Sequence, residues 1–208
     1  MFPVRLALIE DDPEMRELLH GYLCHQPEFD CVAAAPSAEC FLADLPGLPA
    51  APQLLLLDVQ RLDLSSLEAL PLLRQQLPQA DIVLQTLFDD ADLIYQALCR
   101  GASGYLLKNT PLADLKATVL EVAQGGASMS RAVARKVLAH FEPRPAGPPD
   151  LLAPPERAVV QSIVDGLGDQ QVAARLGFSL ETVHIHVKSI YKKMEAGLST
   201  EPVSRMPQ

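Results

Sequence analysis

The stretch QLLLLDV, residues 53–59, decides the fold class of the first half of the chain. Its four consecutive leucines leave no polar face, so the stretch predicts a strand that is buried on both sides. Strands of this kind belong to parallel sheets that helices cover on both faces. The run ends at a carboxylate, Asp58, and the carboxyl ends of parallel strands are where such sheets bind ligands.

Apolar runs of the same type alternate with helix-period segments through the first 125 residues. The apolar runs predict strands at residues 4–9, 30–35, 53–59, 81–86 and 104–107. The segments between and after them predict helices at residues 13–25, 37–45, 66–77, 91–101 and 111–124. Five such repeats indicate an α/β domain with a doubly wound five-stranded parallel sheet.

The second half of the chain has a different organisation. Residues 129–141 predict a connecting helix, and the four prolines of EPRPAGPPD, residues 142–150, predict a linker. Further helices are predicted over residues 154–167, 169–177 and 179–194, with Gly166 and Gly177 as stops and Asp169 and Ser179 as N-caps. A short helix, a tight turn and a longer helix form the outline of a helix-turn-helix.

These patterns divide the chain into three segments. We expect an α/β domain at residues 1–125, a connecting helix and Pro-rich linker at 126–150, and a small all-α helix-turn-helix domain at 151–208. The final stretch, residues 195–208, has no clear periodicity and forms a divergent tail.

The net charge of −9 is unevenly spread along the chain. Residues 1–125 carry 18 acidic and 7 basic residues, whereas residues 151–208 carry 6 of each. A polyanionic partner would therefore contact the C-terminal segment rather than the acidic front.

The sequence also bounds the environment of the protein. It contains no apolar run of the ~18 residues that a membrane helix requires. The N-terminal MFPVRLALIEDD predicts a buried strand rather than a signal peptide. We expect a cytoplasmic protein without membrane contact, whose cysteines lack CxxC spacing and are reduced residues of the core. These cysteines are Cys24, Cys31, Cys40 and Cys99.

Polar residues follow the predicted strands at one edge of the sheet. Carboxylates that converge there without a cation repel one another, and Mg²⁺ relieves such repulsion by binding a few carboxylates together with water. Lys108 and Thr86 offer an ammonium and a hydroxyl group to an incoming anion. The carboxylates are Glu10, Asp11, Asp12 and Asp58.

This set of residues suits phosphoryl transfer onto a carboxylate. The cation would neutralise charge, Lys108 would hold an oxygen of the incoming group, and Asp58 would be the nucleophile. The sequence contains neither a Walker P-loop nor a GxGxxG motif, so nucleotide binding is poorly supported.

Several motifs together resemble the receiver domain of bacterial two-component response regulators. They are IEDDPEMRELL, LLLLDV, LQT and GASGYLLKN, and the resemblance spans residues 4–124. It implies a flavodoxin-like fold in which Asp58 accepts the phosphoryl group. It also implies that Asp11, Asp58 and the backbone carbonyl of Gln60 bind Mg²⁺, which Glu10 reaches through water.

The same resemblance assigns roles around the phosphoryl group. Thr86 would bond to it, Lys108 would pair with it, and Tyr105 would change rotamer together with Thr86. A proline and a glycine are usual after the acceptor, and here Leu62 and Ser66 take their places. We expect phosphorylation to survive these changes, and we expect a looser loop over the metal site and an altered lifetime of the phosphoryl group.

The stretch TVHIHVKSIYKK, residues 182–193, lies in the longest C-terminal helix. His184 and His186 are two residues apart and point ~200° from each other on a helix, so they do not share one metal ion. An apolar stripe is expected to be buried. It consists of Val183, Val187, Ile190 and Met194. The mixed face of Glu181, Ile185, Lys188 and Lys192 is suited to a DNA major groove.

Residues 154–194 resemble the helix-turn-helix domain of LuxR/NarL-type regulators. The resemblance implies that His184, Ile185 and Lys188 contact bases and that Lys192 and Lys193 lie near phosphates. His184 replaces a usual lysine, and APPER, residues 153–157, departs from the usual TPRER. Both departures remove positive charge and predict weak, salt-sensitive binding.

Two functions are consistent with these observations. The favoured one is a response regulator whose phosphorylation at Asp58, by a sensor histidine kinase, controls binding to double-stranded DNA and transcription, with phosphorylation-dependent homodimerisation. The alternative is a phosphorylated signalling protein whose C-terminal domain acts through protein contacts. An enzyme is not expected, although slow autodephosphorylation is.

Overall fold

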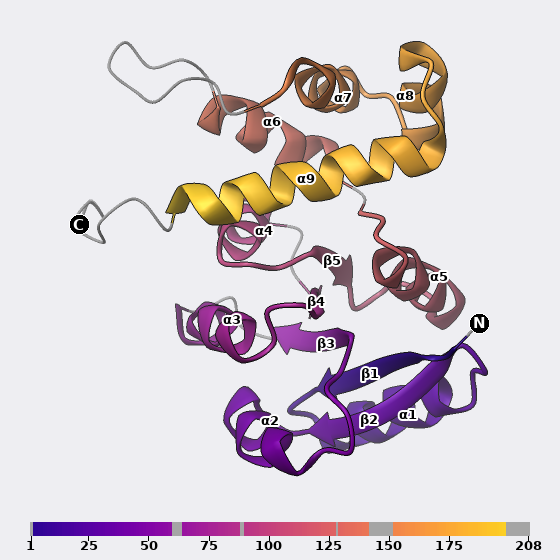
Figure 1. The fold of residues 1–208 in the computed structure, drawn as a ribbon, viewed down its shortest axis with the longest axis vertical. Coiled ribbons are helices and arrows are strands. Elements are labelled where there is room, and N and C mark those ends of the chain that lie inside the picture. Colours follow the sequence, from indigo (N-terminus) through magenta and orange to yellow (C-terminus); the bar gives the residue numbers. More distant parts are fainter. Residues whose placement is uncertain (1, 60–63, 88–89, 128, 142–151, 199–208) are drawn as a thin grey trace. The chain divides into compact units, whose positions relative to one another are not determined.

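The computed structural model describes residues 2–59, 64–87, 90–127, 129–141 and 152–198 (Figure 1). The chain divides into two compact units, residues 1–89 with 102–124 and residues 90–101 with 125–208. In the described part of the chain, no helix is both long and apolar enough to cross a membrane.

The first unit is built on a five-stranded sheet, as the apolar runs predict. All its strands are parallel, in the order β2-β1-β3-β4-β5. The leucines of β3 are buried on both faces, and the doubly wound fold class is confirmed. The strands are β1 (Val4–Ile9), β2 (Phe29–Ala35), β3 (Leu54–Val59), β4 (Asp81–Thr86) and β5 (Gly104–Leu107).

Helices cover both faces of this sheet (Figure 1). One face packs against α1 and α5, whose leucines and valines join those of β1 and β3 in a single hydrophobic core. The other face carries α2 and α3, which contact each other. These elements are α1 (Pro13–Cys24), α2 (Ala38–Asp44), the 3₁₀ helix η1 (Leu45–Gly47), α3 (Leu64–Gln76) and α5 (Leu112–Ala123).

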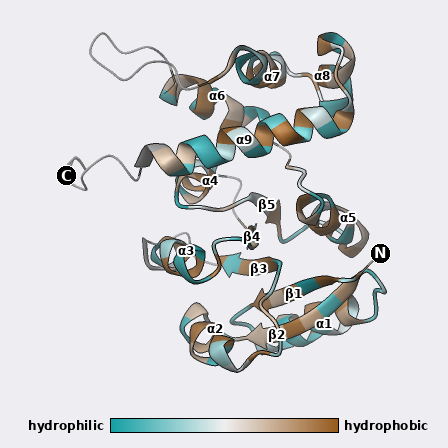
Figure 2. Ribbon diagram, in the orientation of Figure 1, coloured by the Kyte–Doolittle hydropathy of each residue, from teal (hydrophilic) through white to brown (hydrophobic). Residues whose placement is uncertain are grey.

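Among the described residues of the second unit, the regular elements are helices. Its longest helix, α9, contacts α4, α7 and α8, while α6 packs against α4 and α7. Hydrophilic and hydrophobic residues alternate along α9 (Figure 2), and the predicted apolar stripe from Val183 to Met194 is buried. The helices are α4 (Ala91–Cys99), α6 (Arg131–His140), α7 (Pro154–Val164), α8 (Asp169–Leu176) and α9 (Leu180–Leu198).

The turn between α8 and α9 has the predicted helix-turn-helix form. Gly177 ends α8 with a φ of 70°, a left-handed conformation that glycine adopts without strain. Ser179 then caps α9, because its Oγ accepts a hydrogen bond of 3.1 Å from the Thr182 N–H.

Two predictions about helix ends are wrong. Gly168, not Asp169, is the N-cap of α8, and its N–H donates a 3.0 Å hydrogen bond to Gln171 Oε1. Because the Gln171 side chain accepts this bond, α8 does not need a side chain at its N-cap residue. Asp169 instead lies in the first turn, where its negative charge interacts favourably with the helix dipole. The first residues of the expected tail also continue α9 to Leu198, because Glu195 and Ala196 are strong helix formers.

The prediction that all cysteines belong to the core is also wrong. Only Cys99 is buried, Cys31 is half-buried, and Cys24 and Cys40 are exposed; all of them are free. The burial of each cysteine depends on its position in the fold rather than on its residue type. Cys24 is the last residue of α1 and Cys40 lies in the first turn of α2, and both positions are exposed.

Candidate functional site

The candidate site lies where the parallel strands end at a common edge of the sheet. Glu10 follows β1, Asp58 is the fifth residue of β3, and Lys108 follows β5. Because every strand runs in the same direction, residues 98 positions apart in the sequence meet at this edge. The parallel sheet therefore brings Glu10, Asp58 and Lys108 together, as the sequence predicts.

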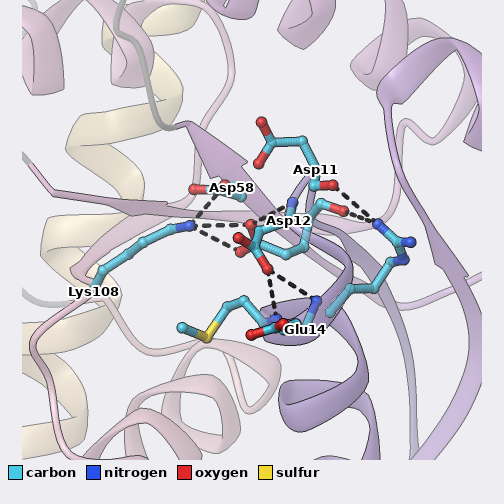
Figure 3. Close-up of polar contacts among 8 residues, drawn as sticks. Asp11, Asp12, Glu14, Asp58 and Lys108 are labelled. Carbon is cyan, nitrogen blue, oxygen red and sulfur yellow. Dashed lines mark hydrogen bonds and ion pairs between the residues drawn. The ribbon is translucent and has the colours of Figure 1, made fainter.

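A single ammonium group holds two buried carboxylates (Figure 3). Lys108 Nζ lies 2.7 Å from Asp58 Oδ2 and 2.9 Å from Glu10 Oε2, and it donates a second hydrogen bond of 3.1 Å to Glu10 Oε1. The exposed fraction of the side chain is 0 % for Glu10 and 3 % for Asp58. Burial excludes water from these ion pairs and strengthens them.

The loop after β1 is held by hydrogen bonds between side chains and the backbone. Arg16 Nη1 donates to the carbonyl oxygens of Glu10 at 2.7 Å and of Asp11 at 3.2 Å. Asp12 caps α1, since its Oδ1 accepts from the N–H groups of Glu14 and Met15 at 2.9 Å. We did not predict this cap, although an aspartate directly before a proline at the first helical position is its usual signal.

Burial perturbs both ends of the Asp58–Lys108 ion pair. It raises the pKa of the Asp58 carboxyl group from 3.8 to about 7, the Glu10 carboxylate adds to the rise, and Lys108 opposes it. Burial alone would lower the pKa of Lys108, but its hydrogen bonds to Asp58 and Glu10 outweigh this effect and raise that pKa. The site therefore holds more negative charge than its lysine neutralises.

The carboxylates fit a divalent cation. Glu10, Asp11 and Asp58 can each offer an oxygen, and these oxygens lie within 4.8 Å of one another. Asp58 Oδ1 is buried and accepts no hydrogen bond from any described residue. An oxygen-rich site with a buried acceptor that lacks a donor suits Mg²⁺. Gln60, whose carbonyl is the remaining predicted ligand, lies outside the described residues, as does Leu62, and nothing is described of the Ser66 side chain.

Thr86 lies on β4, the strand next to Asp58, and Tyr105 lies on β5, the strand beyond β4. Thr86 is the last residue of β4, is buried, and pairs with Val59 of β3, the residue after Asp58. Its carbonyl accepts a 2.8 Å hydrogen bond from the Lys108 N–H. Tyr105 is half-buried on β5, opposite Leu84. The sheet thus brings Thr86 next to the Asp58 and Lys108 backbone.

The residues predicted to contact DNA fall into two groups on α9. Ile185 is 53 % exposed, Lys192 is exposed and Lys188 is half-exposed. In contrast, His184 Nε2 lies 3.2 Å from Asp169 Oδ2, and Lys193 Nζ lies 2.6 Å from Glu156 Oε2. Internal partners therefore already engage at least two of the five predicted side chains.

Glu156 is a structural anchor of the second unit that we did not predict. Its buried carboxylate accepts hydrogen bonds from the Ala153 N–H at 2.7 Å, from Ser189 Oγ at 2.8 Å and from Lys193 Nζ. Burial alone would raise the pKa of Glu156, but these donors hold it below its ordinary value. The group joins the start of α7 to α9. The sequence signal that could have predicted this role is the position of the glutamate in APPER, two residues after the start of a helix.

Two family models match this chain. The model of the response regulator receiver domain matches residues 6–120, and the model of the bacterial regulatory proteins of the luxR family matches residues 150–205. The chain belongs to the response regulators that combine a receiver domain with a LuxR-type helix-turn-helix domain. Members of this family regulate transcription and are not enzymes. Receiver domains generally bind Mg²⁺ and imply a histidine kinase partner, and the LuxR-type domain implies DNA binding.

Named relatives and solved structures agree with this assignment. The chain is 34 % identical to the transcriptional regulatory protein UhpA of Salmonella typhimurium over 98 % of this chain and 97 % of that protein. It is 30 % identical to the nitrate/nitrite response regulator NarL of Escherichia coli over 93 % of this chain and 90 % of that protein.

The response regulator RcsB of Salmonella typhimurium shares the fold. It superposes with a TM-score of 0.56 at 16 % identity, over 97 % of this chain and 100 % of that chain. RcsB has also been solved in a complex with DNA.

We predict that Asp58 makes the metal-free protein less stable as the pH rises from about 4 to about 7. The pKa of Asp58 in the fold, about 7, lies above its ordinary value of 3.8. Between these values the folded state keeps a proton that the unfolded chain has released, so raising the pH favours unfolding. Urea denaturation at about pH 5 and about pH 8 measures the change.

The variant Asp58→Asn is the control, because the amide does not titrate. The stability of the wild-type protein relative to this variant should fall with rising pH, and saturating Mg²⁺ should reduce the fall because the cation replaces the proton. Parallel pH profiles for the two metal-free proteins would contradict the raised pKa.

We predict that Lys193→Ala lowers the free energy of unfolding by about 1–2 kcal/mol, because it leaves a buried carboxylate short of a charged donor. The matched control is Lys192→Ala, which removes the neighbouring, exposed ammonium group and should change stability by less than about 0.5 kcal/mol. Chemical denaturation of both variants tests this difference. Equal free energies of unfolding for Lys193→Ala and Lys192→Ala would show that the Glu156–Lys193 ion pair does not stabilise the packing of α7 and α9.

Proposed function

We propose that the chain accepts a phosphoryl group on Asp58 and that this modification controls its binding to DNA and hence transcription. The observation that carries the proposal is the state of the two Asp58 oxygens. Lys108 holds Oδ2 at 2.7 Å, while the buried Oδ1 accepts no hydrogen bond from the described residues. A carboxylate in this arrangement has one oxygen fixed and the other available for an electrophile or a cation.

We propose that Mg²⁺ is bound by Asp11, Asp58 and the carbonyl of Gln60, with Glu10 acting through water. When bound, Mg²⁺ supplies positive charge that offsets the repulsion between the carboxylates and the incoming phosphoryl group. The same charge favours the ionised form of Asp58, whose pKa burial otherwise raises. The protein's contribution is to keep these oxygens together on a rigid sheet edge.

Phosphorylation is then a displacement at phosphorus by Asp58. A carboxylate oxygen of Asp58 forms a bond to the phosphorus of a phosphohistidine on the sensor kinase, and the bond from phosphorus to the imidazole nitrogen breaks. Lys108 Nζ, already within hydrogen-bonding distance of Asp58, pairs with an oxygen of the transferred group. The Thr86 hydroxyl group donates to another. Slow attack by water on the acyl phosphate later returns Asp58 to its free state.

We propose that the change at Asp58 reaches α9 through α4. Thr86 ends β4 and Tyr105 lies on β5, and α4 is the helix that connects these two strands in the chain. In the second unit α4 packs against α6 and α9, Lys136 of α6 forms an ion pair with Asp92, and the Tyr95 ring lies 5.7 Å from the His140 ring. Movement of Thr86 and Tyr105 toward the phosphoryl group would shift α4 and release α9.

For DNA binding, we propose that Ile185 and Lys188 contact base edges and that Lys192 contacts phosphate. The exposure of Ile185 and Lys192 supports these roles. His184 and Lys193 can join them only by leaving Asp169 and Glu156, respectively. So few free cations make the affinity of one protomer low, and phosphorylation-dependent homodimerisation would double the contacts.

A second function is favoured by the same internal contacts of His184 and Lys193. Because His184 and Lys193 have partners within the helical unit, the cationic face of α9 is reduced, and Ile185 presents an apolar side chain. Such a surface suits a protein partner. In this case phosphorylation at Asp58 persists while salt-dependent DNA affinity is absent.

We predict that Asp58→Asn abolishes phosphate uptake from a small acyl phosphate donor in the presence of Mg²⁺, because the amide is not nucleophilic. The matched control is Asp12→Asn, which removes an adjacent carboxylate but keeps a good N-cap for α1. Covalent phosphate is measured by intact mass or by radioactive label. Label that persists on Asp58→Asn would refute the acceptor assignment.

We predict that beryllium fluoride with Mg²⁺, a mimic of the phosphoryl group, tightens binding to promoter-length DNA. Fluorescence anisotropy at two or more salt concentrations gives the affinity and its salt slope. Lys192→Ala should lower the magnitude of that slope by about 0.9 per bound protomer, the value for one phosphate contact. The control Lys116→Ala, on α5, should leave the slope unchanged.

The same titration decides between the two functions. Binding that depends on salt and strengthens with the mimic supports the switched transcription regulator. Absence of binding in both states, with the mimic shown to bind the receiver domain, supports the function through protein contacts.

A further inference from the structure

A cluster of metal-binding side chains lies where the end of α1 meets β2. His20 and Cys24 are four residues apart and therefore share one face of α1. Cys31 is the third residue of β2, the edge strand of the sheet, and packs against the same core as α1. One nitrogen of His20 and the two sulfurs lie within 4.8 Å of one another.

This cluster is separate from the acidic site. Asp12 at the acidic site caps the first turn of α1, whereas Cys24 is the last residue of that helix. Twelve helical residues span about 18 Å, so the two clusters lie at opposite ends of α1. A ligand of one cluster does not contact the other.

The distances within the cluster are close to those of a metal site. His20 Nε2 lies 3.3 Å from Cys24 Sγ. In a tetrahedral zinc site, bonds of about 2.3 Å to sulfur and about 2.0 Å to nitrogen place the donor atoms about 3.5–3.8 Å apart. The largest separation here, at most 4.8 Å, therefore has to shorten by about 1 Å or less. Cys24 lies at a helix end and is exposed, so its side chain is free to make this adjustment.

The positions of the cysteines leave their sulfurs accessible to an ion. Cys24 is exposed and Cys31 is only half-buried at the edge of the core, whereas Cys99 is buried. A bound cation displaces the thiol protons and makes both sulfurs thiolate ligands.

We propose that His20, Cys24 and Cys31 bind a thiophilic divalent cation of the Zn²⁺ type, with a fourth position open to water. Binding converts two thiols and one neutral imidazole into ligands and releases two protons, with no change in oxidation state. The bound ion links the end of α1 to the edge strand β2 and stabilises this corner of the receiver domain. The site is independent of the function proposed for Asp58.

The test uses the full-length, reduced protein and Zn²⁺ in competition with a chromophoric chelator. We expect one ion per chain, and a loss of affinity of at least about 100-fold in Cys24→Ser, because even outer-shell partners of a metal site contribute 10–100-fold. Cys24→Ser alters an exposed side chain and should fold normally. His20→Asn and Cys31→Ser should weaken binding in the same way.

Two variants serve as controls. Cys40→Ser removes an exposed cysteine outside the cluster and should bind Zn²⁺ as the wild-type protein does. Asp58→Asn should also bind normally, which separates this site from the acidic one. With Co²⁺ as a spectroscopic substitute, the thiolate charge-transfer band should fall by about half in Cys24→Ser, since one of two thiolates remains.

The thermal unfolding midpoint provides an independent measurement. Zn²⁺ should raise it in the wild-type protein and in Cys40→Ser but not in Cys24→Ser, because the ion binds only the folded site. Equal affinity of Cys24→Ser and the wild-type protein would overturn the proposal. So would a Zn²⁺ dissociation constant weaker than about 10 μM for the wild-type protein, since three ligands in a formed site bind far more tightly.

Discussion

The ion pairs of Lys108 with Glu10 and Asp58 are the constraint on which the first unit depends. Two carboxylates are buried at the ends of β1 and β3, and in the described structure one ammonium group from the end of β5 holds both. In a low-dielectric environment an unpaired carboxylate is costly enough to become protonated or to disrupt the fold. The parallel sheet avoids this cost because it brings residues 98 positions apart into contact. The register of its strands therefore determines whether the two carboxylates are paired.

The same arrangement leaves the site one positive charge short. Two carboxylates face one lysine, and burial raises the pKa of Asp58 to about 7. A proton, a divalent cation, or a cation together with a phosphoryl group each restores the balance in a different way. The states that the site can adopt therefore differ in charge, and in the proposed function this difference would change the position of Thr86 and of the helices that follow.

In the helix-turn-helix, internal stability and the proposed DNA contacts depend on the same side chains. Glu156 is buried and needs Lys193 and Ser189 as donors, and Asp169 engages His184. Each of these pairs stabilises the packing of α7 or α8 against α9, yet each also occupies a group on the helix that we propose contacts DNA. A charged side chain that pairs in the interior of a small domain is not available at its surface, which explains why residues 151–208, with balanced charge, leave few free cations on α9.

The sequence by itself determined the features that depend on local pattern. Apolar runs predicted every strand among the described residues, and Gly177 and Ser179 marked the turn before α9. Strand-end positions identified Glu10, Asp58 and Lys108 as neighbours. Hydrophobic period and strand direction are encoded within a few residues, which is why these features could be predicted. Only the tertiary structure decided which side chains become partners across elements. The capture of Lys193 by Glu156 and the meeting of Cys31 with His20 and Cys24 depend on how α9 packs on α7 and how α1 packs on β2. Such contacts join residues whose spacing in the sequence carries no signal, since packing geometry, not period, sets their distance.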